Sequence, residues 1–215
     1  MLAVFFLLCY NKKRRINRKN KIFSLMKFNK DTFDIIFFAR GGQGAKVAAE
    51  IVAQAATKDG KFVQAFPYFG PERSGAPTKT YVRISDFEIR THEPITDPDV
   101  VVVLDETLIG VDDVTANLDE KESLIINTTK SGTEIGERLS HFKGKIHAVD
   151  ASGISLRIIG QPRPNTAILG KFVQVTEMVK LESVVEEFSK IFENKIGKDA
   201  TEKNIQAIRE SYDTI

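Results

Sequence analysis

The residues best suited to chemistry form a glycine-rich cluster between an apolar run and an alanine-rich helical pattern. Five consecutive residues make up the cluster: Arg40, Gly41, Gly42, Gln43 and Gly44. The run at residues 35–38 predicts a buried strand, and residues 45–58 predict a helix. Such a turn directs free backbone N–H groups and the positive end of a helix dipole at one point, where missing Cβ atoms allow close approach. The cluster therefore predicts contact with a phosphate group or a partner's backbone; a tight turn without a ligand is the alternative.

The cluster does not match the common nucleotide-binding motifs. It is not a P-loop, because Lys46 is followed by Val47 where a Ser or Thr would bind magnesium. It also lacks the third glycine of a dinucleotide fingerprint, and the next strand region, residues 62–66, has no acidic residue to hold a ribose.

A second candidate lies in residues 66–77, which hold three prolines, two glycines and three aromatic residues. Rigid loops of this kind on α/β scaffolds usually carry recognition. Within the loop, the planar guanidinium of Arg73 suits a carboxylate or a phosphate group. A structural loop that covers the sheet is the alternative.

Polar residues also follow the later predicted strands, at the edge where open α/β sheets place their ligands. Asp105 and Asn127 occupy such positions, and Asp150 is a third. Asp105 or Asn127 could instead cap the next helix, and for Asp105 capping is the favoured interpretation. The three histidines show no ligand spacing and no nucleophile-elbow sequence is present, so we expect neither a metal site nor a catalytic residue in this chain.

These residues need a scaffold, and apolar runs alternate with helical patterns along the chain. Continuous apolar runs predict buried strands at residues 35–38, 100–104, 124–126 and 146–149. Helical patterns occur at residues 45–58, 132–140, 181–194 and 204–212, with a further helix start at residues 165–166. Residues 79–84 alternate in polarity and are expected to pair with residues 88–91 as a hairpin. The sequence predicts a single α/β domain over residues 26–215, with a mostly parallel sheet flanked by helices and a β-hairpin insertion.

Composition restricts the function further. The chain has 215 residues, of which 42% are hydrophobic, and a single cysteine, Cys9. One cysteine excludes a disulfide framework and a Cys-rich zinc site, and an iron–sulfur cluster needs about four thiolates. Nine of the 31 basic residues, and no acidic residue, fall in residues 1–30, so the rest of the chain holds 22 basic and 29 acidic residues. This acidic balance argues against nucleic-acid binding, and the cysteine usage fits a cytoplasmic protein.

Residues 1–25 form an extension with its own pattern. An apolar stretch at residues 1–10, about half of what spans a bilayer, precedes a basic run at residues 12–21. A secretory signal has the opposite order, and stable membrane insertion is not expected. A weak membrane-surface anchor, a basic tail and upstream sequence outside the working protein remain as interpretations. Met26, directly before the folded pattern, favours the last of them.

Five motifs occur in an order that resembles one protein family. They are Arg40-Gly-Gly-Gln-Gly-Ala45, Ala65-Phe-Pro-Tyr-Phe-Gly70, Glu72-Arg-Ser-Gly-Ala-Pro77, Pro98-Asp99 leading into Val101-Val-Val-Leu-Asp105, and Pro164-Asn165-Thr166 with Leu169-Gly170. Together they resemble the gamma subunit of 2-oxoacid:ferredoxin oxidoreductases, most closely the pyruvate (pyruvate synthase) and 2-oxoisovalerate types. The resemblance covers about residues 27–212.

The resemblance implies a reaction that interconverts pyruvate, coenzyme A and oxidised ferredoxin with acetyl-CoA, carbon dioxide and reduced ferredoxin. It also implies that thiamine diphosphate with Mg²⁺ lies between alpha and beta subunits, while 4Fe–4S clusters belong to the beta and delta subunits. The gamma subunit would carry none of these groups. We therefore expect a hetero-oligomeric complex in which this chain is not active alone.

The resemblance further implies that the gamma subunit helps to enclose the coenzyme A path. The turn of Gly41, Gly42, Gln43 and Gly44 would contact phosphate groups through backbone N–H donors. Arg40 or Arg73 would add positive charge, and Asn127 could join them. Three alternatives stay open: a purely structural assembly subunit, a 2-oxoisovalerate-specific enzyme of the same family, and a free-standing nucleotide-binding α/β protein, which the missing ribose partner disfavours most.

Overall fold

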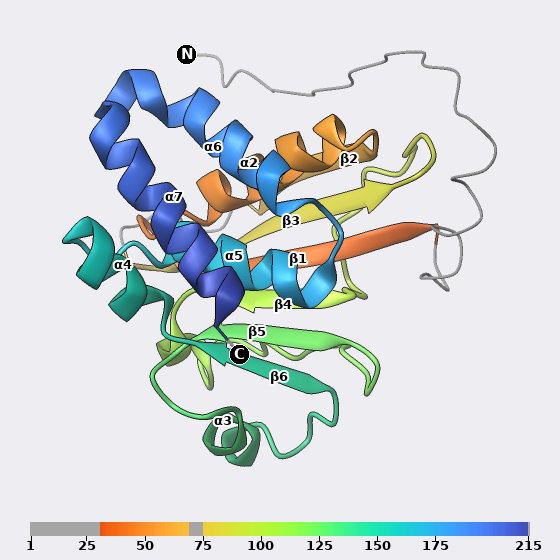
Figure 1. Ribbon diagram of the computed structural model, residues 1–215. Coiled ribbons are helices and arrows are strands. Elements are labelled where there is room, and N and C mark those ends of the chain that lie inside the picture. The colour runs from red at the N-terminus through yellow and green to blue at the C-terminus, as the bar shows by residue number, and fades with distance from the viewer. Residues whose placement is uncertain (1–30, 69–74, 215) are drawn as a thin grey trace.

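A six-stranded sheet organises the computed structural model, which describes residues 31–68 and 75–214 (Figure 1). Residues 1–25 and Arg73 lie outside these ranges. The strands follow the order β2-β3-β1-β4-β5-β6 across the sheet. Their bounds are β1 (Thr32–Arg40), β2 (Phe62–Tyr68), β3 (Pro77–Ser85), β4 (Val100–Val103), β5 (Ser123–Asn127) and β6 (Lys145–Val149).

Strands β1, β4, β5 and β6 run parallel and correspond to the four predicted apolar runs. In β1, the side chains of Ile35 and Phe37 face one side of the sheet and those of Ile36 and Phe38 face the other, and all four are buried. A strand covered on both faces gains free energy from apolar residues at every position, which explains why these runs do not alternate in polarity.

Helices cover one face of the sheet. They are α2 (Ala45–Lys58), α4 (Ala151–Ile159), α5 (Pro164–Thr176), α6 (Leu181–Ile196) and α7 (Lys198–Asp213). Figure 1 shows α5 and α7 crossing in front of the central strands. The larger hydrophobic core lies between these helices and the sheet, and includes the rings of Phe37 and Phe172, whose centroids are 6.2 Å apart.

The opposite face has a different cover. Helix α3 (Gly132–Arg138) and the loops between β3 and β5 enclose a second core there, which contains Leu108, Val114 and Ile135. The short 3₁₀ helix η1 (Glu106–Leu108) belongs to one of these loops. The predicted α/β architecture with a mostly parallel sheet is confirmed.

The predicted partner of the hairpin is wrong. Strand β3 contains residues 79–84, but it pairs antiparallel with β1 on one side and with β2 on the other. Both hydrogen-bonding edges of β3 are therefore occupied, and residues 88–91 form no strand. The antiparallel insertion consists instead of β2 and β3, which occupy one side of the sheet.

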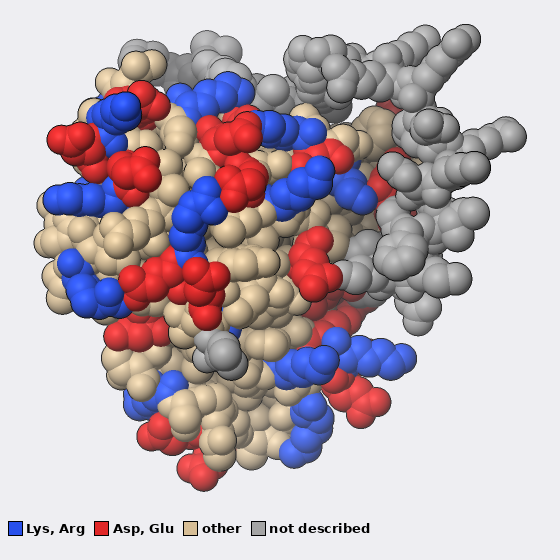
Figure 2. Space-filling model, in the orientation of Figure 1, with Lys and Arg blue, Asp and Glu red and all other residues tan. Residues whose placement is uncertain are grey.

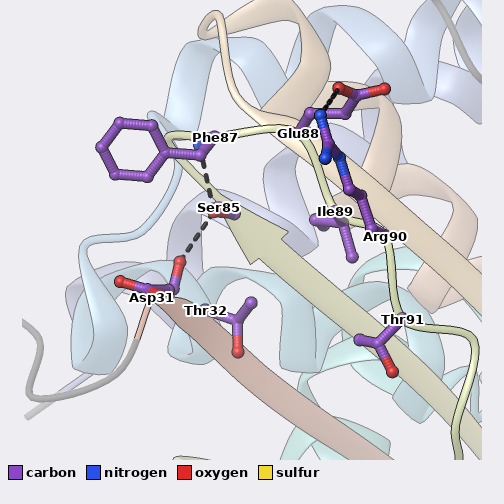
Figure 3. A pocket seen from close by; sticks show the side chains of 8 residues that line it. All are labelled: Asp31, Thr32, Ser85, Phe87, Glu88, Ile89, Arg90 and Thr91. Atoms are coloured by element: carbon purple, nitrogen blue, oxygen red, sulfur yellow. Dashed lines mark hydrogen bonds and ion pairs between the residues drawn. The ribbon is translucent and has the colours of Figure 1, made fainter.

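A cavity of ≈ 320 Å³ lies at the amino end of β1, between Asp31, Thr32 and the segment that follows β3 (Figure 3). The Ser85 hydroxyl donates a hydrogen bond to the backbone oxygen of Asp31 (2.7 Å) and accepts one from the N–H of Phe87 (3.0 Å). The glycine-rich turn follows Arg40, at the carboxyl end of the same strand. The cavity and the turn are therefore at opposite edges of the sheet.

Charged side chains of both signs intermingle on the helical face (Figure 2). Ion pairs link helices there: Arg209 of α7 donates to both carboxylate oxygens of Glu182 of α6 at 2.8 Å, Arg157 of α4 pairs with Glu210 of α7, and Lys58 of α2 pairs with Glu186 of α6. Within the described ranges, no helix is long and apolar enough to cross a membrane.

Candidate functional site

The glycine-rich turn lies beside the point of the sheet from which successive strands are added in opposite directions. After β1 the chain passes through α2 to β2 and β3 on one side, whereas β4 leads to β5 and β6 on the other side. Strands β1 and β4 are neighbours, and the N–H of Leu104 donates to the backbone oxygen of Phe38 at 2.8 Å. Open α/β sheets bind ligands in the crevice at such a switch point, beyond the carboxyl ends of the strands.

The conformation of the turn depends on its glycines. Gly42 has φ +96° and Gly44 has φ +81°, values that side chains with a Cβ rarely adopt. Gly44 is the N-cap of α2, makes no side-chain cap, and precedes a first turn without an acidic residue. The following backbone N–H groups donate to no acceptor in the described residues: those of Gly42, Gly44, Ala45, Lys46 and Val47. These donors, at the positive end of a 14-residue helix, suit an anion.

Side chains lock the turn to the end of β4. The Gln43 side chain accepts a hydrogen bond from the N–H of Arg40 (2.7 Å) and donates one to the carboxylate of Asp105 (2.7 Å). The Arg40 guanidinium donates to the Thr107 hydroxyl at 2.9 and 2.8 Å and to the backbone oxygen of Gly75 at 3.1 Å. Its Nε also lies 3.5 Å from Asp105. Arg40 therefore holds the turn in place with groups of its own chain.

Asp105 is the common acceptor of this network. It caps η1, with its carboxylate accepting from the N–H of Thr107 (2.9 Å) and from its hydroxyl (2.6 Å). Burial by itself would raise the pKa of Asp105, but the hydrogen bonds from Thr107 and Gln43 and the charge of Arg40 hold it below its usual value. The predicted capping role is confirmed, and Asp105 stays ionised at neutral pH.

Asn127 lies at the same edge of the sheet with its amide directed inward. The Nδ2 atom donates to the backbone oxygen of Leu104 (2.8 Å) and to the Ser152 hydroxyl (2.9 Å), and Oδ1 accepts from the N–H of Ser152 (3.0 Å). Asn127 thereby ties the ends of β4 and β5 to the start of α4. Asp150 caps α4, since its carboxylate accepts from the N–H of Gly153 at 2.7 Å.

Two residues near the turn were not selected as site residues from the sequence. Asn165 lies in the first turn of α5, and a Cβ on Gly44 would be 2.6 Å from its Nδ2 and 2.8 Å from its Cγ. Lys46 is exposed in the first turn of α2, where the helix dipole opposes a positive charge. The motif Pro164-Asn165-Thr166 gave a signal for a helix start, but not for contact with Gly44.

Among the described residues, the turn combines backbone N–H donors that suit an anion with side chains that hold its conformation. The histidines lie elsewhere: His92 is near Gln64, His141 contacts the Thr115 hydroxyl, and His147 lies within β6. Among the described residues, no group of three or more His, Cys, Asp or Glu side chains could hold a metal ion.

Known proteins have sequences similar to that of this chain. A family model for pyruvate ferredoxin/flavodoxin oxidoreductase matches residues 34–214. The pyruvate/ketoisovalerate oxidoreductases common subunit gamma of Thermococcus kodakarensis is 50% identical over 83% of this chain and 95% of that protein. The pyruvate synthase subunit PorC of Methanothermobacter marburgensis is 45% identical over 84% of this chain and 96% of that protein.

Solved structures share the fold. The pyruvate oxidoreductase subunit PORC of Thermotoga maritima has a TM-score of 0.76 and 39% identity, over 85% of this chain and 96% of that chain. The 2-oxoglutarate:ferredoxin oxidoreductase of Magnetococcus marinus has a TM-score of 0.67 and 19% identity, over 85% of this chain and 31% of that chain, and shows likeness of fold alone. The family model, the relatives near half identity and the common fold lead to one conclusion: the chain belongs to the pyruvate ferredoxin/flavodoxin oxidoreductase family, as a subunit of the gamma type.

Proposed function

We propose that this chain is the gamma subunit of a complex that interconverts pyruvate, coenzyme A and oxidised ferredoxin with acetyl-CoA, carbon dioxide and reduced ferredoxin. Pyruvate is named in both relatives at 50% and 45% identity, which supports it as the substrate. Ketoisovalerate is named in the first of them, so a branched-chain 2-oxoacid is the alternative substrate.

In this proposal the chain binds coenzyme A at the turn of Gly41 to Gly44, with the phosphate groups against the free N–H donors of α2. The observation that carries the proposal is a row of N–H donors at the sheet's switch point that have no acceptor among the described residues, next to a first helical turn that holds Lys46 and no acidic residue. A phosphate there satisfies the donors and relieves the repulsion between Lys46 and the helix dipole.

The other proposed site residues would act by positioning, Arg40 on the turn and Asn127 on the neighbouring strand ends. Arg40 and Asn127 use their side chains on neighbouring segments, so we assign them to positioning. The added charge of Arg73 stays a prediction. Alpha, beta and delta subunits, with thiamine diphosphate, Mg²⁺ and 4Fe–4S clusters, would supply the carbon and electron chemistry. This chain would hold coenzyme A in a fixed orientation for that chemistry.

Hydrogen–deuterium exchange of the assembled complex tests the proposal. Coenzyme A should slow exchange at the backbone N–H groups of Gly42 and of Gly44 to Val47, because a phosphate would occupy these donors. Peptides from β6 should exchange equally with and without coenzyme A. If the turn is protected in the complex to the same extent without coenzyme A, a partner subunit covers it and the chain has a structural assembly role.

A charge reversal gives an independent kinetic test. We expect Lys46→Glu to raise the KM for coenzyme A by about 10-fold. The new carboxylate would repel the bound phosphate, and this repulsion costs more free energy than one hydrogen bond to a charged group contributes. Lys121→Glu is the matched control, since Lys121 is exposed before β5, at the opposite edge of the sheet. Equal KM values for the two variants would contradict a phosphate site at the turn.

A further inference from the structure

Asn165 connects two helix starts that are far apart in the sequence. It occupies the second position of α5, and its carboxamide lies against the Cα of Gly44, the N-cap of α2. Gly44 thus needs to be glycine for two reasons, its φ of +81° and the space that the Asn165 side chain fills. The amide is consequently fixed beside the free N–H groups of the turn.

The carboxamide of Asn165 has no hydrogen-bond partner among the residues that the structure describes. It is half-buried, and no hydrogen bond joins its Nδ2 or Oδ1 to a described residue. By comparison, Asn127 at the same edge of the sheet engages both of its amide atoms. Neither amide atom of Asn165 is among the buried side-chain atoms without a partner, so both remain accessible to a ligand, and a purely steric contact with Gly44 would need no polar group.

We propose that Asn165 is a ligand-contacting residue that donates its Nδ2 hydrogens to a phosphate oxygen bound at the glycine-rich turn. This inference rests on the proposed function, because it assigns a side chain to the coenzyme A site. The ligand class is a phosphate or diphosphate ester, and Asn165 adds a directional donor to the backbone donors of α2. Helix α5 thereby takes part in binding, although it follows the turn by more than a hundred residues.

The isosteric variant Asn165→Asp separates a binding role from a structural one. An acidic side chain in the first turn of α5 complements the helix dipole, so the melting temperature of the assembled complex should stay equal or rise. The same carboxylate would repel a phosphate, and the KM for coenzyme A should rise at least about 10-fold. The kcat at saturating coenzyme A should stay unchanged, because the proposed contact affects binding alone.

Salt dependence and a matched control sharpen the test. Added salt should reduce the difference in KM between Asn165→Asp and Asn165→Ala, because one variant acts through charge and the other through a lost donor. Thr133→Asp places the same charge at the second position of α3, where Thr133 is exposed, and should leave the KM unchanged.

The outcomes distinguish the two proposals. If coenzyme A protects the turn from hydrogen exchange in the wild-type complex and Asn165→Asp keeps the wild-type KM, the assignment of Asn165 is wrong and the coenzyme A site stands. A lower melting temperature together with a higher KM would show a structural role and also overturn the assignment. If the wild-type turn gains no protection from coenzyme A, both proposals fail.

Discussion

Gly170→Ala addresses a close approach of helices α5 and α7. Gly170 lies in α5, and a Cβ there would be 1.9 Å from the backbone oxygen of Ile208 and 2.6 Å from the backbone nitrogen of Tyr212, both in α7. Carbon and oxygen atoms in contact normally lie about 3.3 Å apart or more. Because both obstacles are backbone atoms, no change of rotamer removes the overlap, and α7 would have to move by more than about 1 Å.

The magnitude follows from two opposing effects. Alanine in a helix interior is worth about 1 kcal/mol more than glycine, whereas overpacking of a filled core costs about 1–3 kcal/mol and sometimes more. A forced backbone shift places the overpacking cost at the upper end of its range, about 3 kcal/mol. The alanine gain of about 1 kcal/mol offsets part of it, so we expect the free energy of unfolding to fall by about 2 kcal/mol. For a chain of this size that corresponds to a loss of about 4–8 °C in melting temperature.

Thermal and denaturant unfolding of the full chain would measure the effect, with Gly136→Ala as the matched control. Gly136 lies in α3, and a Cβ there would be 3.7 Å from the Cδ1 of Ile146, an ordinary contact. The same substitution should therefore stabilise the protein by about 0.5–1 kcal/mol at Gly136. Equal stabilisation by both variants would refute the close packing of α5 against α7.

Two further predictions concern charged groups. Arg83→Met should lower the free energy of unfolding by about 3–5 kcal/mol, because the buried Asp34 loses the guanidinium that donates to it at 2.9 Å. In denaturant unfolding, the double variant Arg83→Met with Asp34→Leu should recover most of this loss. Burial, with the charges of Lys171 and Lys145, lowers the pKa of His147. His147 therefore binds a proton less readily in the folded state than in the unfolded state. The free energy of unfolding should fall as the pH drops from the ordinary histidine pKa of about 6.5 towards the lower pKa of His147 in the folded state. His147→Gln should flatten the measured dependence of unfolding free energy on pH in this window, and an unchanged slope would contradict the reasoning.

The sequence predicted most elements because their signals are local. Buried parallel strands appeared as continuous apolar runs, α2 appeared as an alanine-rich helical pattern, and α6 appeared through spacing of apolar residues at steps of three and four. Helix α4 was not predicted, and Asp150, which caps it, was identified only as a polar residue after a predicted strand. The terminal helix was predicted from residue 204, whereas α7 begins at Lys198. Its first turns are polar, so apolar spacing gave no signal there.

The pairing of strands could not be predicted from local sequence patterns. The alternation in residues 79–84 indicated an antiparallel strand but not its partner, and the nearest segment was chosen. In the folded chain β3 lies between β1 and β2. Hydrogen-bonded partners depend on which strand edges are free once the sheet has assembled, and nearness in sequence does not determine that.

For the site, the sequence by itself determined the turn. Glycines at residues 42 and 44 permit the positive φ values and leave N–H donors uncovered, and both effects arise within a few residues. The tertiary structure decided which side chains surround these donors. It joined Gln43 and Arg40 to Asp105, directed the Asn127 amide inward, and set Asn165 against Gly44. These contacts follow from how β4, β5 and α5 pack at one edge of the sheet, because side chains distant in the sequence meet only after the elements that carry them have assembled.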